Sequence, residues 1–136
     1  MADKRVALVL SGGVSLGAYI AGALDELLRA FDAGHAHPNG DRYTIDVITG
    51  ASAGATTAGI VAHGLLFGGG TTRLHNVWVE RIDAADLLAP DSIQPATLLS
   101  GAPLQQIAVD VFAWPAGQPT APARCCAGQL YVAMTL

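Results

Sequence analysis

A serine in the middle of the chain lies in a pattern that is typical of acyl-transfer nucleophiles. In a G-x-S-x-G sequence, a sharp turn between a strand and a helix swings the serine out of the strand, and bulky neighbours would clash there. A β-like run over residues 43–49 precedes the pattern, and a run of small residues over 55–66, suited to a helix, follows it. At a helix N-terminus, free N–H groups favour the negative charge that develops during acyl transfer. The pattern consists of Gly50, Ala51, Ser52, Ala53 and Gly54, with Ser52 as the candidate nucleophile.

A glycine-rich turn upstream is a candidate oxyanion hole. An apolar run over residues 5–10, suited to a buried parallel strand, breaks into this turn at residues 11–17 before a helix begins. Side chains do not obstruct the backbone amides of Gly12 and Gly13, so these amides can point at an anion bound beside Ser52. The rival interpretation is a phosphate site. The spacing of Gly12 and Gly17 disfavours it, because the turn lacks both the Lys-Ser/Thr of a P-loop and the Rossmann G-x-G-x-x-G.

Together the two motifs resemble those of the patatin-like phospholipase family, acyl hydrolases related to the catalytic domain of cytosolic phospholipase A2. The resemblance covers roughly the first half of the chain. The family's opening motif, glycine-glycine-glycine-x-basic-glycine, aligns with residues 12–17, where Val14 replaces the third glycine and Leu16 replaces the basic residue. The second motif matches in full at residues 50–54. Since valine still supplies a backbone N–H, the resemblance assigns the oxyanion hole to Gly12, Gly13 and Val14.

The resemblance also implies a serine–aspartate dyad that acts on lipid esters, as in phospholipases and lysophospholipases. In this family the aspartate precedes a glycine far downstream of the serine, and this chain has no Asp-Gly pair. We therefore expect the aspartate beyond Leu136, and we interpret residues 1–136 as the amino-terminal part of a single patatin-like domain. Because the members of such a catalytic set depend on one another, the segment alone is expected to be close to inactive.

The apolar runs predict an α/β fold. We expect a three-layer α/β/α arrangement with a mainly parallel central sheet that is incomplete in this chain. Strands are predicted near residues 5–10, 44–49 and 129–136, whereas open parallel sheets usually hold about five or six strands with helices on both faces. Charged residues make up 13% of the chain, against about 25% in ordinary soluble domains. Exposed apolar edges and faces, and hence poor solubility, are expected for the isolated segment.

Helical spacing of apolar residues predicts three amphipathic segments besides the helix over 55–66. One follows the glycine-rich turn, one begins near Arg73, and one covers residues 104–112. The first is predicted to turn Tyr19, Ile20, Leu24, Leu27, Leu28 and Phe31 toward the core, and the second Leu74, Val77, Trp78 and Ile82.

The net charge and the composition restrict the classes of partner and ligand that we expect for this chain. The net charge is −4 and basic residues form no cluster, so we expect no nucleic-acid partner. We predict no cofactor and no metal, since His35, His37 and His75 lack metal-ligand spacing and are expected to be solvated. The adjacent Cys125 and Cys126 are expected to be buried or free thiols. We expect a cytoplasmic protein with a lipid or phospholipid substrate and peripheral contact with a membrane surface.

Three further classes of protein stay open. An acyltransferase of the malonyl-transferase type would carry histidine where Ala51 stands. An α/β-hydrolase would have its elbow later in the chain and would need a downstream histidine. His63 does not supply the base, because eleven residues of one straight helix separate it from Ser52 by roughly 16 Å. The third class is a non-catalytic, truncated patatin-like fragment or pseudoenzyme that binds lipid.

Overall fold

A three-stranded parallel sheet with helices forms the described part of the chain. The computed structural model describes residues 3–13, 16–68, 72–87, 102–113 and 121–135. The strands lie in the order β1-β2-β3, and each neighbouring pair is parallel. In chain order the elements are β1 (Asp3–Leu10), α1 (Gly17–Ala36), β2 (Arg42–Ala51), α2 (Ala53–Phe67), α3 (Thr72–His75), the π-helix η2 (Asn76–Arg81), α4 (Ala84–Leu87), α5 (Ala102–Phe112) and β3 (Cys126–Thr135). The predicted α/β class and all three predicted strands are confirmed.

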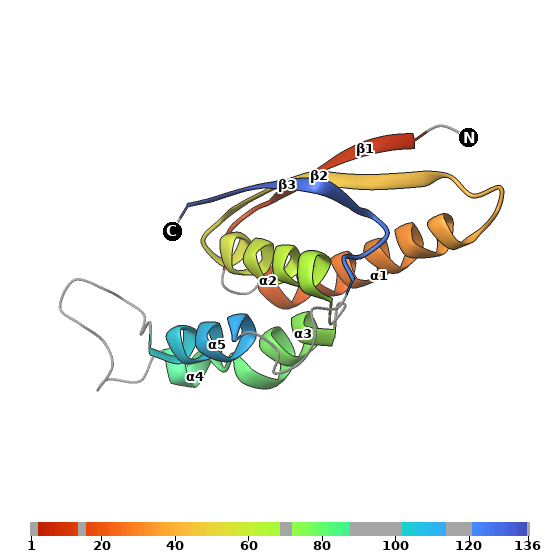
Figure 1. Ribbon diagram of the computed structural model, residues 1–136. Helices are drawn as coiled ribbons and strands as arrows, with labels where there is room; N and C mark the ends of the chain where they lie inside the picture. Colours follow the sequence, from red (N-terminus) through yellow and green to blue (C-terminus); the bar gives the residue numbers. More distant parts are fainter. Residues whose placement is uncertain (1–2, 14–15, 69–71, 88–101, 114–120, 136) are drawn as a thin grey trace.

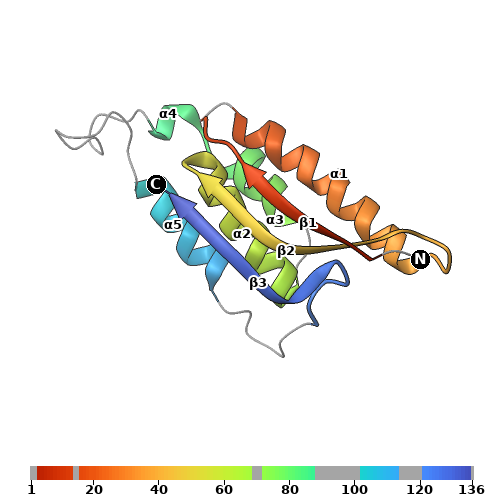
Figure 2. The ribbon, with the colours of Figure 1, turned by 90° about the horizontal axis from the view of Figure 1, so that it is seen from above.

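The described helices all lie on one side of the sheet (Figure 1). Helices α1 and α2 pack directly beneath the strands, and α3, α4 and α5 form a further layer below them. Viewed from above, the sheet lies over the helices and its strands run in the same direction (Figure 2). The connection from β1 to β2 and the connection from β2 to β3 each move to the next strand in the same direction across the sheet. Since crossovers between parallel strands have the same hand, both place their helices on the same face of the sheet. The incomplete arrangement is therefore a sheet covered on one face in the part of the chain that the structure describes.

The uncovered face of the sheet carries exposed apolar side chains. Along β1, Leu8 and Leu10 are buried against the helices, whereas Val9 between them is 79% exposed. Tyr131 on β3 is 61% exposed. Such a surface is unfavourable in water, in agreement with the exposed apolar face that the sequence predicts.

Helix α2 lies at the centre of the packing and is buried almost all round. It lies between the sheet and the outer helical layer, and the buried residues of this helix run from Ala53 to Leu65 with few interruptions. Most of its side chains are small, which allows close packing on both sides. A helix without a polar face is expected at such a buried position.

A β-bulge in β2 sets which side chains reach the helices. The register with β1 shifts between Val6, which pairs with Ile45, and Ala7, which pairs with Val47. Asp46 is the extra residue of this bulge, and its carboxylate accepts a hydrogen bond of 2.7 Å from the Arg5 Nε. Ile45 and Ile48, three positions apart, are both fully buried as a result.

Two expectations about the helices need correction or refinement. Tyr19 is 76% exposed, so its predicted place in the core is wrong. The buried positions of α1 are 17, 21, 24, 28 and 31, and Tyr19 projects from the opposite side of that stripe. Leu74, Val77 and Trp78 are buried as predicted, but the helix beyond His75 is a π-helix, which the apolar spacing did not indicate.

Candidate active site

Ser52 occupies the sharp turn between β2 and α2. The strand ends at Ala51 and the helix begins at Ala53, so Ser52 is the N-cap residue. Its backbone has φ 52° and ψ −122°, and among the described non-glycine residues only Ser52 has a positive φ. Strained backbone of this kind is costly and persists only where its surroundings fix it, and it clusters at functional sites. The backbone thus adopts the elbow that the G-x-S-x-G sequence predicts.

Backbone hydrogen bonds hold the turn, and the Ser52 hydroxyl takes no part in them. The Ser52 N–H donates to the carbonyl oxygen of Thr135 at 2.8 Å, which ties the turn to the end of β3. The Ser52 carbonyl accepts from the N–H groups of Ala55 and Thr56 in the first turn of α2. The Ser52 hydroxyl makes no capping hydrogen bond, and the residue is exposed. The hydroxyl is therefore available to a substrate.

The two glycines of the pentapeptide are required by close backbone approach. A Cβ on Gly50 would overlap the carbonyl group of Gly54. A Cβ on Gly54 would overlap the carbonyl oxygens of Leu10 and Ser11, at the end of β1. Glycine at both positions lets the start of α2 lie directly against the neighbouring strand end. This contact brings the serine turn beside the glycine-rich turn.

The structure places Gly12, one of the three candidate oxyanion donors, next to Ser52. A Cβ on Gly12 would lie 3.1 Å from the Ser52 Cβ and 3.0 Å from the Ala51 carbonyl oxygen. Gly13 has φ 131°, a conformation that favours glycine, and its carbonyl accepts from the Leu16 N–H at 3.0 Å. Val14, the third predicted donor, lies outside the described residues. The oxyanion role of these amides stays a prediction.

Trp78 supports the glycine-rich turn from behind, a role that its place in an apolar stripe did not indicate. A Cβ on Gly17 would overlap the Trp78 ring, so the indole packs directly on the first residue of α1. Trp78 is 8% exposed, and its Nε1 has no hydrogen-bond partner among the described residues. The sequence feature that corresponds to this contact is Gly17, a glycine at the start of a helix and five residues after Gly12.

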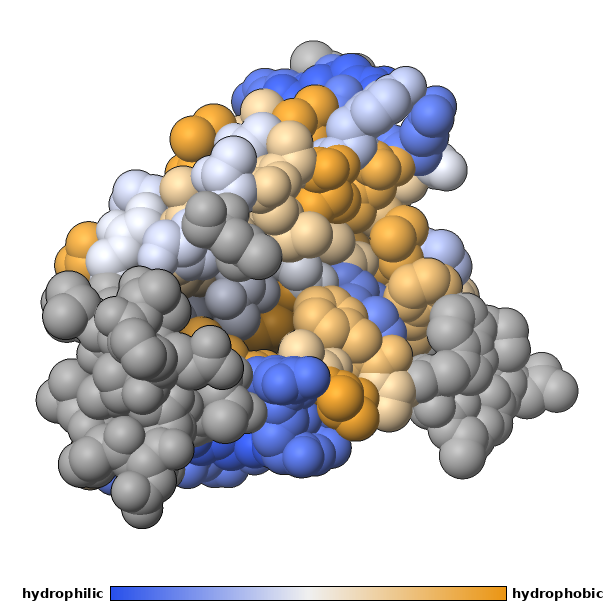
Figure 3. All heavy atoms as spheres, turned by 90° about the vertical axis from the view of Figure 1, so that its left-hand side faces the viewer, coloured by the Kyte–Doolittle hydropathy of each residue, from blue (hydrophilic) through white to orange (hydrophobic). Residues whose placement is uncertain are grey.

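The face toward which the strands run, on the left in Figure 1, is hollowed (Figure 3). Apolar atoms are visible in the floor of the hollow. Ser52 follows the last residue of β2 and therefore belongs to this end of the sheet. Ligands of open α/β sheets bind at the carboxyl ends of the strands, and this end is therefore the place to expect a substrate.

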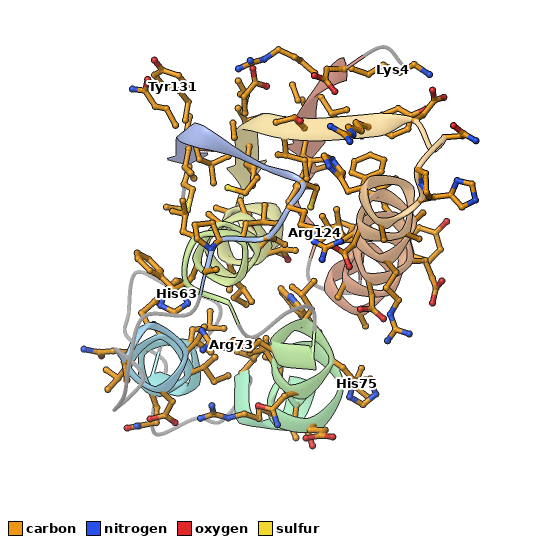
Figure 4. All side chains as sticks on the ribbon, turned by 45° about the vertical axis from the view of Figure 1, so that its right-hand side comes forward. Lys4, His63, Arg73, His75, Arg124 and Tyr131 are labelled. Atoms are coloured by element: carbon orange, nitrogen blue, oxygen red, sulfur yellow. The ribbon has the colours of Figure 1, made fainter. Side chains whose placement is uncertain are left out.

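Neither a carboxylate nor an imidazole of the described residues is hydrogen-bonded to the Ser52 hydroxyl. His63 lies eleven residues further along the continuous helix α2, about 16 Å away at the rise of an α-helix. Its Nδ1 faces Arg73 Nη1 at 2.5 Å, and Figure 4 shows the two side chains directed toward each other. His63 also packs against the rings of Phe67 and Phe112. It links α2 to the outer helices and does not serve Ser52.

The stability of the chain is expected to fall in mild acid because of His63. A guanidinium only donates, so Nδ1 must accept and the imidazole must be neutral. Burial, and secondarily the Arg73 charge, lower the pKa of His63 in the folded chain below its usual value of about 6.5. The unfolded chain therefore binds more protons below that pH, and the free energy of unfolding decreases as the pH falls through this range.

Urea unfolding of the wild type and of His63→Gln between pH 5 and 8.5 measures this contribution. The variant is expected to lose less stability than the wild type between pH 7 and 5. Above pH 7.5, where the imidazole is neutral in both states, the two profiles should run parallel. An equal loss in acid for both proteins would contradict the assignment to His63.

The other histidines and the cysteines form no metal centre within the described ranges, where no cluster of three or more metal-binding side chains occurs. His35 corrects the expectation of solvated histidines, because it is half-buried and its Nε2 bonds the Tyr43 carbonyl oxygen at 2.7 Å. Its place at the end of α1, beside the start of β2, explains this contact. Cys125 and Cys126 are free thiols, as predicted. None of the described helices is long and apolar enough to cross a membrane.

Comparison with known proteins adds one finding to this geometry. The Patatin-like phospholipase family model matches residues 8–116, a range that contains both the glycine-rich turn and the serine turn. No curated protein and no solved structure matches the chain.

Proposed function

Because the chain belongs to the patatin-like phospholipase family, whose members are generally lipid hydrolases, we propose that it carries the nucleophile of a serine acyl hydrolase. The family acts on lipid substrates. The proposed substrates are lipid esters of the phospholipid or lysophospholipid type. Residues 1–136 would form the amino-terminal part of one catalytic domain.

One observation carries this proposal. Ser52 combines a strained positive φ, an exposed position and close approach of Gly12, where an added Cβ would lie 3.1 Å from the Ser52 Cβ. A purely structural turn has no need of a strained serine beside a glycine-rich turn, whereas a nucleophile needs both exposure and nearby N–H donors.

The proposed reaction begins with attack of the Ser52 Oγ on the ester carbonyl carbon while its proton passes to a base. The N–H groups of Gly12, Gly13 and Val14 would stabilise the negative oxygen of the tetrahedral intermediate. The C–O bond to the leaving alcohol then breaks, the alcohol takes up the proton, and an acyl-serine remains. Water attacks this ester and releases the fatty acid. We assign the base to an aspartate beyond Leu136, since no aspartate of the chain precedes a glycine.

Covalent labelling with a fluorophosphonate tests the proposal. The full gene product is treated with the probe, digested, and the Ser52 peptide is weighed, while hydrolysis of a short-chain aryl ester is followed in parallel. Labelling at Ser52 together with ester turnover is expected. Labelling only at another serine, with turnover intact, would contradict the assignment of the nucleophile.

The second candidate is a pseudoenzyme that keeps the lipid-binding fold without a working dyad. The observation that favours it is the lack of any Asp-Gly pair in the chain. Unlabelled Ser52 combined with retained binding to phospholipid vesicles would support this candidate, and loss of both labelling and vesicle binding would contradict both candidates.

Cytoplasmic residence with contact at a membrane surface is part of the proposal, and the exposed Val109 and Phe112 of α5 offer apolar contact area. Vesicle sedimentation of the same protein tests that contact.

A further inference from the structure

A cavity lies at the end of the molecule away from Ser52. Its volume is about 340 Å³, and it lies between α1, α2, the start of α3 and the segment that leads into β3. Gly64 and Leu65 of α2 line it, and they lie twelve and thirteen residues beyond Ser52, about 18 Å along the helix. The cavity is therefore separate from the candidate active site.

The walls of this cavity are mainly apolar. Leu28 comes from α1, Val61 and Leu65 from α2, and Leu74 from α3, and all four are buried. The segment before β3 closes the cavity, and the Ala123 N–H donates to the Leu65 carbonyl at 2.8 Å to hold it there. Figure 4 shows Arg124 on this segment, between α1 and α2.

Cys125 adds a neutral polarizable group to the wall. It lines the cavity and is 2% exposed. Burial raises the pKa of the Cys125 thiol, which therefore stays protonated at neutral pH. A buried, protonated cysteine behaves as a small hydrophobic residue, so apolar groups can pack against the cavity wall at this position.

Two charged side chains also line the cavity, and they favour an uncharged headgroup over an anionic one. Arg29 is engaged with Asp25, whose Oδ2 lies 3.0 Å from its guanidinium. Asp32 also lines the cavity and, within the described part of the chain, forms no ion pair. An anionic headgroup would meet the Asp32 carboxylate, whereas Arg29, the cation among the described residues that line the cavity, is already paired with Asp25. An uncharged headgroup meets no such repulsion.

We propose that this cavity binds the alkyl chain of a neutral single-chain amphiphile, such as a medium-chain alcohol or monoacylglycerol, with the hydroxyl end near Arg29 and Asp32. Its volume lies within the range of small-molecule pockets, about 300–1,000 Å³, and an apolar lining with few polar groups is typical of them. The site does not rest on the proposed function, because binding is measured without ester turnover.

Calorimetric titration of the full chain with 1-decanol and with decanoate at pH 7.5 tests the proposal. Decanol is expected to bind with a Kd at least tenfold lower than that of decanoate. Val61→Phe places a ring in the cavity and is expected to abolish decanol binding. Val79→Phe, the same substitution at a position that is 58% exposed and does not line the cavity, is the matched control and should bind as the wild type does.

Asp32→Asn provides a test that does not depend on repacking the core, since Asp32 is exposed. It is expected to bring the Kd of decanoate to within about threefold of that of decanol. The absence of decanol binding to the wild type, or equal binding to folded Val61→Phe, would overturn the cavity as the site. Decanoate binding that is equal to that of decanol in the wild type, or unchanged by Asp32→Asn, would overturn the preference for a neutral headgroup.

Discussion

Gly54→Ala is expected to lower the free energy of unfolding by about 3 kcal/mol or more, which is at or above the upper end of the usual cost of overpacking. The added methyl group would overlap the carbonyl oxygens of Leu10 and Ser11. Both neighbours are backbone atoms, so no side chain can rotate away. The start of α2 must then move from the end of β1, and with it Ser52 from Gly12. Fluorophosphonate labelling of Ser52 should fall together with stability.

Gly22→Ala is the matched control for this substitution. Gly22 lies within α1, and a Cβ there would meet nothing within 4 Å. Alanine is favoured over glycine inside a helix by up to about 1 kcal/mol, so this variant should be as stable as the wild type or more stable. Urea denaturation of both variants measures the difference. Equal stability of Gly54→Ala and Gly22→Ala would mean that β1 and α2 do not touch as the structure describes.

The local parts of the fold follow from local sequence. Apolar runs bounded by glycine-rich turns predicted the strands, because a buried parallel strand needs no polar alternation. The strands begin two or three residues earlier than predicted, and β2 also ends two residues later. The elbow at Ser52 and its nearness to Gly12 also followed from the motifs, since each needs small residues for a backbone reason that the structure shows.

The features that sequence reasoning missed all depend on contacts between distant segments. The bulge at Asp46 has no glycine to mark it, and only the pairing of β2 with β1 reveals it. The packing of Trp78 on Gly17 joins residues sixty-one positions apart in the chain. His35 is held by the Tyr43 carbonyl, a backbone group that an amino-acid sequence does not display. The cavity likewise forms only when four segments lie together, namely α1, α2, α3 and the segment that leads into β3.

The base of the proposed reaction depends on the same kind of long-range placement. The sheet presents Ser52 and Gly12 at one end, and β3 supports the turn through the bond from the Ser52 N–H to Thr135. These contacts position the proposed nucleophile and one of its proposed donors, and within the described residues they supply no proton acceptor. A proton acceptor on a further segment is therefore consistent with the contacts of the described residues, which position Ser52 and Gly12.

Ser52→Ala and Ser52→Gly are both expected to reduce fluorophosphonate labelling of the full gene product to background, since each removes the nucleophilic oxygen. Their stabilities should differ. Alanine keeps a Cβ at φ 52°, and backbone strain of this kind costs about 1–3 kcal/mol. Glycine relieves the strain but gains about 0.5–1 kcal/mol of conformational freedom in the unfolded chain. Ser52→Gly should thus be the more stable variant by about 1 kcal/mol in urea unfolding.

The same pair of substitutions at Ser11, in the neighbouring turn, calibrates this difference. Ser11 does not have a positive φ, so Ser11→Gly should be less stable than Ser11→Ala by roughly 0.5–1 kcal/mol. A reversed order at Ser52 relative to Ser11 would demonstrate strain at the elbow in solution. The same order at both positions would show that the elbow is relaxed, and backbone strain would then no longer distinguish Ser52 as a nucleophile even if its labelling were observed.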